Sequence, residues 1–368
     1  MVNENIAHSY LANVYCHFKF ETTLVMYKEP ENINIKVYSP INIDSNDEKF
    51  FRNTGNVIPQ IGYKVLDNVF IDEYGSVYNS EGQVVNCNFL AYKYFDRNIF
   101  SKSIQYEDEL ILIFYKWSVN NYFHWITESL PRVFNLPNEI LQNVRILVPE
   151  SDSINFITDS LNMLGLYSTS IIKKNHIMKV KKLIVPNFIH RMDYFNSKII
   201  LSIRNKLLNR NETKIIFDNI CICRKNSMHR KVINELEYYS LLEQYGFKLI
   251  NFEDYSLKEQ ISISHSAKII LGIHGAGLTN ILFMQERSIV FELKRNLHKY
   301  PLSFDSIVNG TNSYFYLSNI LKLNYFYQFC DLVKTIPKRN NNMCDFYIDL
   351  EKTKNNLNKV FDFYGKQN

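Results

Sequence analysis

The sequence is poor in glycine and tryptophan and has no long hydrophobic run. Only 11 of its 368 residues are glycine and two are tryptophan. No window approaches the roughly 18 uninterrupted apolar residues that a membrane-spanning helix needs. The N-terminus also lacks the basic region and long apolar core of a signal peptide. We therefore expect a soluble, non-secreted protein located in the cytoplasm.

Metal-binding patterns are also absent. None of the six cysteines forms a CxxC pair, and no His or Cys pair follows Cys221 and Cys223 at zinc spacing. We expect free thiols in a reducing compartment. The Asp-x-Asp motif, the usual acidic clamp for a metal-bound diphosphate, does not occur in the chain. The expected site therefore contains no metal and no cofactor.

The charge balance is nearly even. The chain has 42 Lys and Arg against 37 Asp and Glu, a net charge of +5. This excess is too small to indicate a nucleic-acid binder, so no nucleic-acid partner is expected. It would suit a small acidic ligand such as a nucleoside diphosphate. The aromatic content of 14 % is compatible with large cores or with sugar stacking.

The order of sequence patterns predicts an α/β fold. The first hundred residues alternate apolar and polar positions, as strands do. A strand–helix series then follows, with strands at 110–117, 144–150 and 169–174 and helices at 121–136 and 153–166. A helical stretch at 196–212 separates it from a second series, with strands at 219–224, 248–253, 268–273 and 288–293 and helices at 233–247 and 256–267. An amphipathic helix at 349–365 ends the chain. Two Rossmann-like domains are predicted, with ligands at the carboxyl ends of their strands.

The segment HGAGLTN lies where such a ligand would bind. It follows the strand at 268–273 and opens a helix, whose first N–H groups and positive dipole end favour an anion. Glycine allows close backbone approach and positive φ. We interpret the segment as a diphosphate cradle, although a tight turn without a ligand would have the same sequence. Its residues are His274, Gly275, Ala276, Gly277, Leu278, Thr279 and Asn280.

Charged residues stand at the ends of two neighbouring strands. Glu292 closes the strand at 288–293, where a carboxylate would accept hydrogen bonds from ribose hydroxyls. Arg224 ends the strand at 219–224, and Arg230 follows six residues later; their guanidinium groups would bind phosphate. Taken singly, each is compatible with an ordinary surface residue.

The first series contains a candidate catalytic pair. His124 and Glu128 are four residues apart on one helical face, in an apolar and aromatic stretch. A partly desolvated carboxylate suits a base that works near neutrality. Two structural interpretations stay open: a His–Glu pair within a core helix, or a salt bridge from Glu128 to Arg132.

The stretches NYFHWITESLPRVFNL and ILGIHGAGLTNILFMQERSIVFEL, with CICRKNSMHRKVINE between them, resemble glycosyltransferase family 61. The similarity runs in order over about 105–295. It implies a GT-B architecture, in which two Rossmann-like domains face each other across a cleft and a C-terminal helix crosses back. The domains would be 1–190 on the acceptor side, 191–335 for the nucleotide sugar, and 336–368 as the return segment.

The resemblance also implies an activity. Family members transfer a sugar from a nucleotide donor with inversion and without a required metal. Arg224, Arg230, the residues 274–280 and Glu292 would hold the donor, here expected to be a UDP-sugar, and Glu128 would act as the base, with His124 beside it. We expect a glycan acceptor, in polysaccharide or glycoconjugate synthesis of the bacterial capsule type. A lipid-linked acceptor would bring the protein to a membrane surface.

Two other function classes are compatible with the sequence. A non-catalytic sugar-nucleotide or glycan binder would keep the glycine segment and Glu292 but would not need Glu128. Another two-Rossmann sugar-nucleotide enzyme, such as an epimerase, would need further acid and base groups beside the diphosphate.

Overall fold

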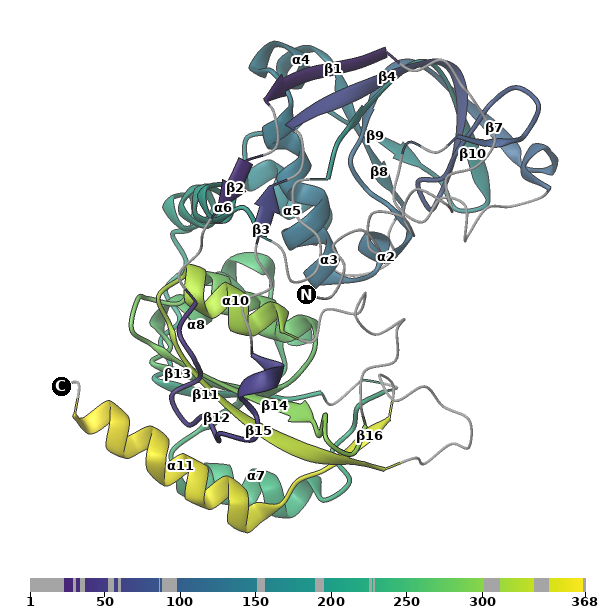
Figure 1. The fold of residues 1–368 in the computed structure, drawn as a ribbon. Helices are drawn as coiled ribbons and strands as arrows, with labels where there is room; N and C mark the ends of the chain where they lie inside the picture. The colour runs from purple at the N-terminus through teal and green to yellow at the C-terminus, as the bar shows by residue number, and fades with distance from the viewer. Residues whose placement is uncertain are drawn as a thin grey trace. The chain divides into compact units, whose positions relative to one another are not determined.

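The computed structural model describes residues 23–28, 31–33, 37–51, 56–58, 61–85, 87, 98–150, 156–188, 195–224, 227, 229–300, 312–333 and 344–366. They form a mixed α/β structure of two compact units (Figure 1). Unit 1 draws its described residues from Met1–Pro30, Pro59–Ser153 and Gly165–Ile189. Unit 2 draws its own from Glu31–Ile58, Ile154–Leu164 and His190–Asn368.

Unit 1 contains a mixed sheet. Its strands follow the order β6-β5-β4-β10-β7-β8-β9, with β1 paired to β4. The run from β10 to β9 is parallel, whereas β4 is antiparallel to β1, β5 and β10. The parallel sheet expected here is therefore correct for only half of the strands. The strands are β1 (Thr23–Lys28), β4 (Ile61–Asp72), β5 (Val77–Tyr78), β6 (Val84–Val85), β7 (Ser103–Leu112), β8 (Arg145–Pro149), β9 (Thr169–Ile172) and β10 (His176–Pro186).

The helical segment of unit 1 changes type along its length. The predicted helix at 121–136 is present as α3 (Tyr122–His124), the π-helical turn η4 (Trp125–Ser129) and the 3-10 helix η5 (Leu130–Asn135). The strand predicted at 110–117 ends earlier, because β7 stops at Leu112 and α2 (Lys116–Val119) follows. The remaining helices of this unit are η3 (Ile99–Ser101) and α4 (Asn138–Asn143).

Unit 2 contains the doubly wound sheet that the second series predicts. The strand order is β12-β11-β13-β14-β15-β16, parallel except for β16. The direction of winding reverses between β11 and β13, which makes their carboxyl ends the switch point of the sheet. The strands are β11 (Asn219–Ile222), β12 (Lys248–Ile250), β13 (Ile269–Ile273), β14 (Ile289–Arg295), β15 (Asn324–Val333) and β16 (Asp345–Tyr347).

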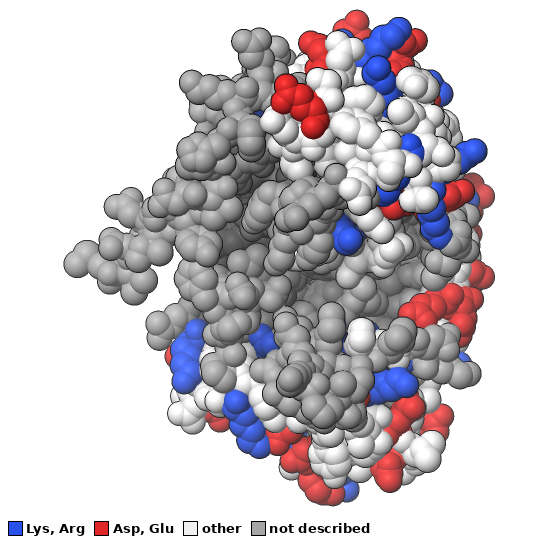
Figure 2. All heavy atoms as spheres, turned by 90° about the vertical axis from the view of Figure 1, so that its right-hand side faces the viewer, with Lys and Arg blue, Asp and Glu red and all other residues white. Residues whose placement is uncertain are grey.

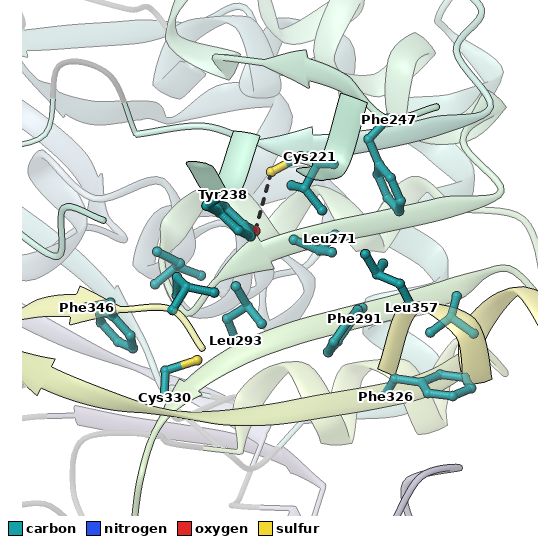
Figure 3. Close-up of a cluster of buried hydrophobic side chains, with 14 of the residues drawn as sticks. Cys221, Tyr238, Phe247, Leu271, Phe291, Leu293, Phe326, Cys330, Phe346 and Leu357 are labelled. Carbon is teal, nitrogen blue, oxygen red and sulfur yellow. Dashed lines mark hydrogen bonds between the residues drawn. The ribbon is translucent and has the colours of Figure 1, made fainter. Parts of the chain in front are cut away.

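Apolar side chains on one face of this sheet form a core with α7 and α11. Leu271, Phe291 and Leu293 point from the strands toward Tyr238 of α7 and Leu357 of α11 (Figure 3). The buried face of the C-terminal helix thus packs within unit 2. The unit's helices are α5 (Phe156–Met163), α6 (Ser197–Asn209), α7 (Glu235–Gln244), η6 (Phe252–Asp254), α8 (Leu257–Ser266), η7 (Ala276–Phe283), α10 (Ser313–Ile320) and α11 (Leu350–Gly365).

An early part of the chain also lies in unit 2. It comprises β2 (Glu31–Ile33), the 3-10 helix η1 (Glu48–Phe50) and β3 (Asn56–Ile58), and β2 pairs with β3. The backbone N–H of Ile41 donates to the Tyr325 carbonyl, and Asn42 bonds the backbone of Tyr327. Residues 37–51, which we call the N-terminal strap, therefore lie along β15, as the purple segment of Figure 1 shows.

The described surface carries both signs of charge. On the face in Figure 2, Lys and Arg side chains are interspersed with Asp and Glu. In the part of the chain that the structure describes, no helix combines the length and apolar character needed to cross a membrane. Cys87, Cys221, Cys223, Cys330 and Cys344 are free thiols.

Candidate functional site

The switch point of unit 2 brings together residues from two segments of the chain. Arg224 and Arg230 follow β11, and the glycine segment 274–280 follows β13, the neighbouring parallel strand. Residues after adjacent parallel strands share one edge of the sheet. The structure thus places Arg224, Arg230, His274 and Gly275 side by side, as the sequence predicts.

The glycines are needed for space and not for positive φ. Gly275 is extended (φ 174°), and neither it nor Gly277 is among the positive-φ residues. A Cβ atom at Gly275 would overlap the guanidinium group of Arg224, and one at Gly277 would lie 2.9 Å from Ile222 Cγ2. The expectation of positive φ is therefore wrong. The group that lies close to the backbone of Gly275 is the Arg224 side chain, and close approach of a diphosphate stays a prediction.

Arg224 and Arg230 form a partly buried pair of like charges. Arg224 Nη2 donates to Ser227 Oγ (2.9 Å), and Arg230 Nη1 donates to the His274 carbonyl (2.6 Å). The Nε atoms of both are buried and have no hydrogen-bond partner among the described residues. No ion pair joins either arginine to a carboxylate of the described residues. Arg230 also has φ 58°, an unusual backbone for a non-glycine residue.

Burial and mutual repulsion disfavour both charges. Burial lowers the pKa of Arg224, and burial together with the Arg224 charge lowers the pKa of Arg230 to about 10. Both guanidinium groups remain charged at neutral pH. Two partly buried cations beside a helix start form a site that an anion would stabilise.

Glu292 lies behind His274, on β14. The carboxylate is fully buried, its Oε1 is 2.5 Å from His274 Nδ1, and its Oε2 accepts a hydrogen bond from Tyr325. The His274 ring is 26 % exposed. In this arrangement His274 is reachable by a ligand and Glu292 is not, so the geometry does not favour the direct ribose contact expected from the sequence.

The end of the glycine segment faces the protein interior. Leu278, Thr279 and Asn280 are fully or almost fully buried. Asn280 Nδ2 donates to Gln260 Oε1 on α8 (3.0 Å), which fixes the segment to that helix. Their side chains are therefore structural, and the accessible part of the segment is His274, Ala276 and Gly277.

Unit 1 contains the predicted catalytic pair. Asn121 caps α3 by accepting hydrogen bonds from the backbone N–H groups of Phe123 and His124. His124 Nδ1 lies 2.8 Å from Glu128 Oε2, and the hydroxyl of Tyr115 donates to the same carboxylate oxygen. Glu128 is 2 % exposed and His124 is 17 % exposed. The π-helical turn that contains Glu128 is a form often found at functional sites.

Arg132, the alternative partner of Glu128, bonds backbone carbonyl groups. It is completely buried, and its guanidinium group donates to the carbonyls of Pro186 (Nε, 2.9 Å) and Ile113 (Nη1, 2.6 Å). The ring of Phe188 lies 4.2 Å from its Cζ atom. These contacts give Arg132 a structural role that does not require a salt bridge to Glu128.

Two residues of these clusters were not predicted. Tyr115 follows β7 and bonds Glu128, and Tyr314 on α10 donates to the Gly275 carbonyl (2.6 Å). Tyr314 also packs edge-on against His274, with ring centroids 5.3 Å apart. No motif marks either residue, because each reaches its partner only through the fold.

Metal ligands are not grouped in the part of the chain that the structure describes. There, no three His, Cys, Asp or Glu side chains are arranged to hold a metal ion. Metal independence of the reaction stays a prediction, and calorimetry of UDP in EDTA and in Mn²⁺ tests it.

Comparison with known proteins finds a family match in the central part of the chain. Residues 122–291 match the family model described as Glycosyltransferase 61. This range includes His124, Glu128, Arg224, Arg230 and the glycine segment.

Curated relatives match a shorter stretch. The chain is 34 % identical over 79 residues to the EGF domain-specific O-linked N-acetylglucosamine transferase of Gallus gallus, and 35 % over 79 residues to that of Xenopus laevis. The corresponding protein of Drosophila melanogaster is 33 % identical over 72 residues. The first two matches cover 20 % of this chain and 15 % of each relative's length. The third covers 19 % of this chain and 14 % of the Drosophila melanogaster protein.

Proposed function

Since residues 122–291 match the family model described as Glycosyltransferase 61, we propose that this protein transfers a sugar from a nucleoside diphosphate sugar to an acceptor hydroxyl. The observation that carries the proposal is the partly buried pair Arg224 and Arg230 beside the glycine segment, at the switch point of a doubly wound sheet. An epimerase is less consistent with this site, because the residues assigned to acid–base chemistry lie in the other unit.

The donor would be held by unit 2. Its diphosphate would contact the two guanidinium groups, one of which packs against Gly275, and the first N–H groups of η7. Positive charge supplied in this way would stabilise the departing diphosphate without a divalent ion. We expect a UDP-sugar, and N-acetylglucosamine is the first sugar to test because the curated relatives are named for it.

The acceptor would be activated by unit 1. His124 is the more exposed member of the pair, so it would take the proton of the acceptor hydroxyl while Glu128 orients the ring and balances the charge. The acceptor oxygen then bonds to the anomeric carbon as the bond from that carbon to the diphosphate breaks. A single displacement inverts the configuration. This mechanism requires the GT-B arrangement, which is part of the proposal.

The acceptor and setting are also part of the proposal. The sequence favours a glycan acceptor in cytoplasmic synthesis of a surface polysaccharide. The name of the curated relatives makes an EGF domain the second acceptor to test.

A transfer assay tests the proposed function. The purified chain is incubated with a panel of UDP-sugars and both acceptor classes, in EDTA and with added Mn²⁺, and products are analysed by mass spectrometry and NMR. We expect transfer with inversion, and equal UDP affinity in EDTA and Mn²⁺ by calorimetry. A tenfold or greater loss of affinity in EDTA would contradict metal independence. Tight UDP-sugar binding without transfer or hydrolysis would favour the non-catalytic binder.

A further inference from the structure

The polar groups behind His274 form a continuous chain that starts in the N-terminal strap. The Phe50 carbonyl accepts a hydrogen bond from Asn312 Nδ2 (2.6 Å), and Asn312 Oδ1 accepts one from Lys294 Nζ (2.8 Å). Lys294 Nζ lies 3.9 Å from Glu292 Oε2 and 5.1 Å from the centre of the Phe51 ring. The strap thus holds Asn312, Asn312 holds Lys294, and Lys294 lies beside the carboxylate that bonds His274.

Strand geometry explains why Glu292 and Lys294 act together. Side chains two residues apart on a strand point to the same face. Leu293, between them, points into the core shared with α7 and α11, so Glu292 and Lys294 point to the opposite face, where Asn312 and the strap lie. Tyr325, on the neighbouring strand β15, donates to Glu292 on this face.

The charged and titratable groups that face His274 come from three elements. They are Glu292 and Lys294 on β14, Arg230 after β11, and Tyr314 on α10. Burial, then the Arg230 and Lys294 charges, lower the pKa of His274 and outweigh the opposing effect of Glu292. Burial opposes ionisation of Glu292, but Lys294 and the hydrogen bond with His274 lower its pKa overall.

The protonation states fix the tautomer of the ring. An ionised carboxylate only accepts hydrogen bonds, so a neutral His274 must carry its proton on Nδ1, the atom 2.5 Å from Glu292. Nε2 then has a lone pair and no proton. This ring accepts a hydrogen bond and does not donate one to a phosphate oxygen.

We propose that His274 accepts a hydrogen bond from a hydroxyl group of the donor through Nε2, and that Glu292, Lys294 and Asn312 are positioning residues that hold it in this state. The hydroxyl belongs to the ribose or to the transferred sugar. The ligand in this inference rests on the proposed function, whereas the state of His274 is a property of the free protein.

The state of His274 is tested by NMR of the full chain without ligand. The histidine ring signals are followed from pH 8 to pH 5, and those of His274 are identified by their loss in His274→Gln. We expect the neutral Nδ1–H tautomer at pH 7 in the wild type. In Lys294→Met the titration midpoint should rise, because a nearby positive charge is removed.

Two further variants complete the NMR test. Lys322→Met removes a surface lysine of the same unit that pairs with Glu286, and it should leave the His274 titration unchanged. Asn312→Ala removes the hydrogen bond that holds Lys294 but keeps the lysine charge. It should raise the titration midpoint of His274 by a smaller amount than Lys294→Met does. It replaces Lys294→Met in the test if that variant does not fold. A charged His274 at pH 7 in the wild type, or equal titrations in all three variants, would overturn the proposed role of the chain.

The ligand is tested by calorimetry with UDP and UDP-N-acetylglucosamine. His274→Phe should weaken binding about 5- to 100-fold, since it leaves a donor hydroxyl unpaired, and His274→Gln should recover part of the loss. A loss with both ligands assigns the hydroxyl to the ribose, and a loss only with the sugar nucleotide assigns it to the sugar. Wild-type affinity in His274→Phe would overturn the contact.

The pH dependence of binding separates this inference from the proposed function. Wild type and Lys322→Met should bind UDP-N-acetylglucosamine equally well at pH 8 and pH 6, whereas Lys294→Met should bind it more weakly at pH 6, where more of its His274 is protonated. If the wild type binds neither ligand, the proposed donor and the hydroxyl contact are both wrong, and the NMR titration still decides the state of His274.

Discussion

Gly275 shows what a motif does and does not reveal at the residue scale. The sequence predicts that glycine at this place lets a diphosphate come close to the backbone. It does not reveal that Arg224, which lies 51 positions earlier, packs against Gly275, because this contact exists only since β11 and β13 are neighbours. Likewise, the sequence places Glu292 and Asn280 at a predicted ligand site but does not reveal that both are buried. In the structure, Asn280 bonds Gln260 on α8 and Glu292 bonds Tyr325 on β15.

Gly275→Ala tests the packing of the arginine pair. The added methyl group would overlap the Arg224 guanidinium and displace it. We expect UDP affinity to fall at least about tenfold, with a small loss of stability, because charge-assisted hydrogen bonds depend strongly on geometry. Calorimetry and thermal unfolding measure the two effects.

The matched control for this variant is Gly365→Ala. A Cβ atom there meets nothing within 4 Å, so affinity and stability should be unchanged or slightly improved. Wild-type UDP affinity in Gly275→Ala would remove the arginine pair from the donor site.

Glu128→Gln tests the proposed catalytic pair, in which Glu128 orients His124 and balances its charge. Its carboxylate bonds His124, and a neutral amide neither fixes the ring in the same way nor balances the charge of a protonated imidazole. We expect kcat to fall by about 10²–10⁴, with UDP affinity and Tm nearly unchanged. His124→Gln should lower kcat by at least as much. Turnover, affinity and Tm are measured on the same preparations.

Glu139→Gln, an exposed change on α4, is the control and should behave like wild type. If Glu128→Gln has full activity, this pair is not part of the mechanism. If it loses activity together with a clearly lower Tm, the pair has a structural role.

At the scale of elements, local pattern predicts some parts of the fold and misses others. The apolar runs of β13 and β14 predict buried parallel strands because both faces of that sheet are covered. β10 was not predicted, although it is a central strand that pairs with both β4 and β7. Its apolar pattern is interrupted by solvent-facing lysines at Lys179, Lys181 and Lys182. β15, α10 and the strap also went unpredicted, since they are defined by contacts across long separations, such as Asn42 with Tyr327.

Phe51→Ala tests the strap. Phe51 is buried and packs against Phe315, Tyr327 and Phe329 of unit 2. Loss of this ring should destabilise unit 2 by about 3–5 kcal/mol, the usual cost of a large buried truncation. Denaturant unfolding measures the change, and UDP affinity should fall as well, because Phe50 anchors Asn312.

Phe100→Ala is the matched control. This ring is 45 % exposed in unit 1 and should cost much less. Equal effects of the two substitutions would show that the strap contributes little to unit 2.

At the scale of the whole molecule, the candidate donor site depends on a distant segment of the chain that packs in the same unit. Length and composition predict more than one domain, and each unit has its own sheet. The sequence does not show that residues 37–51, far from the donor segment in the chain, contact the unit that carries it. That arrangement arises from the exposed edge of β15, which Ile41 and Asn42 occupy. Charge states inside unit 2 therefore depend on a segment outside the family match.

His274 contributes to the dependence of global stability on pH. Its pKa in the folded protein lies below the ordinary value of 6.5. Between these two values the unfolded chain binds the proton and the folded chain does not, so the free energy of unfolding decreases as pH falls below about 6.5. The contribution is fully present above that pH. Glu292, with a pKa lowered from 4.5, stays ionised in the same window and adds no slope.

The measurement is Tm from pH 8 to pH 5.5 for the wild type and for His274→Gln. Replacing the ring introduces a constant offset in Tm through the lost contact with Glu292, and it removes the titrating group. We therefore expect the wild type to lose more stability than the variant over this interval, so that the difference in Tm between them changes with pH. The other histidines contribute equally to both proteins and cancel. Parallel Tm curves would mean that His274 has the same pKa in the folded and unfolded chain, and that the charges of Arg230 and Lys294 do not keep it neutral.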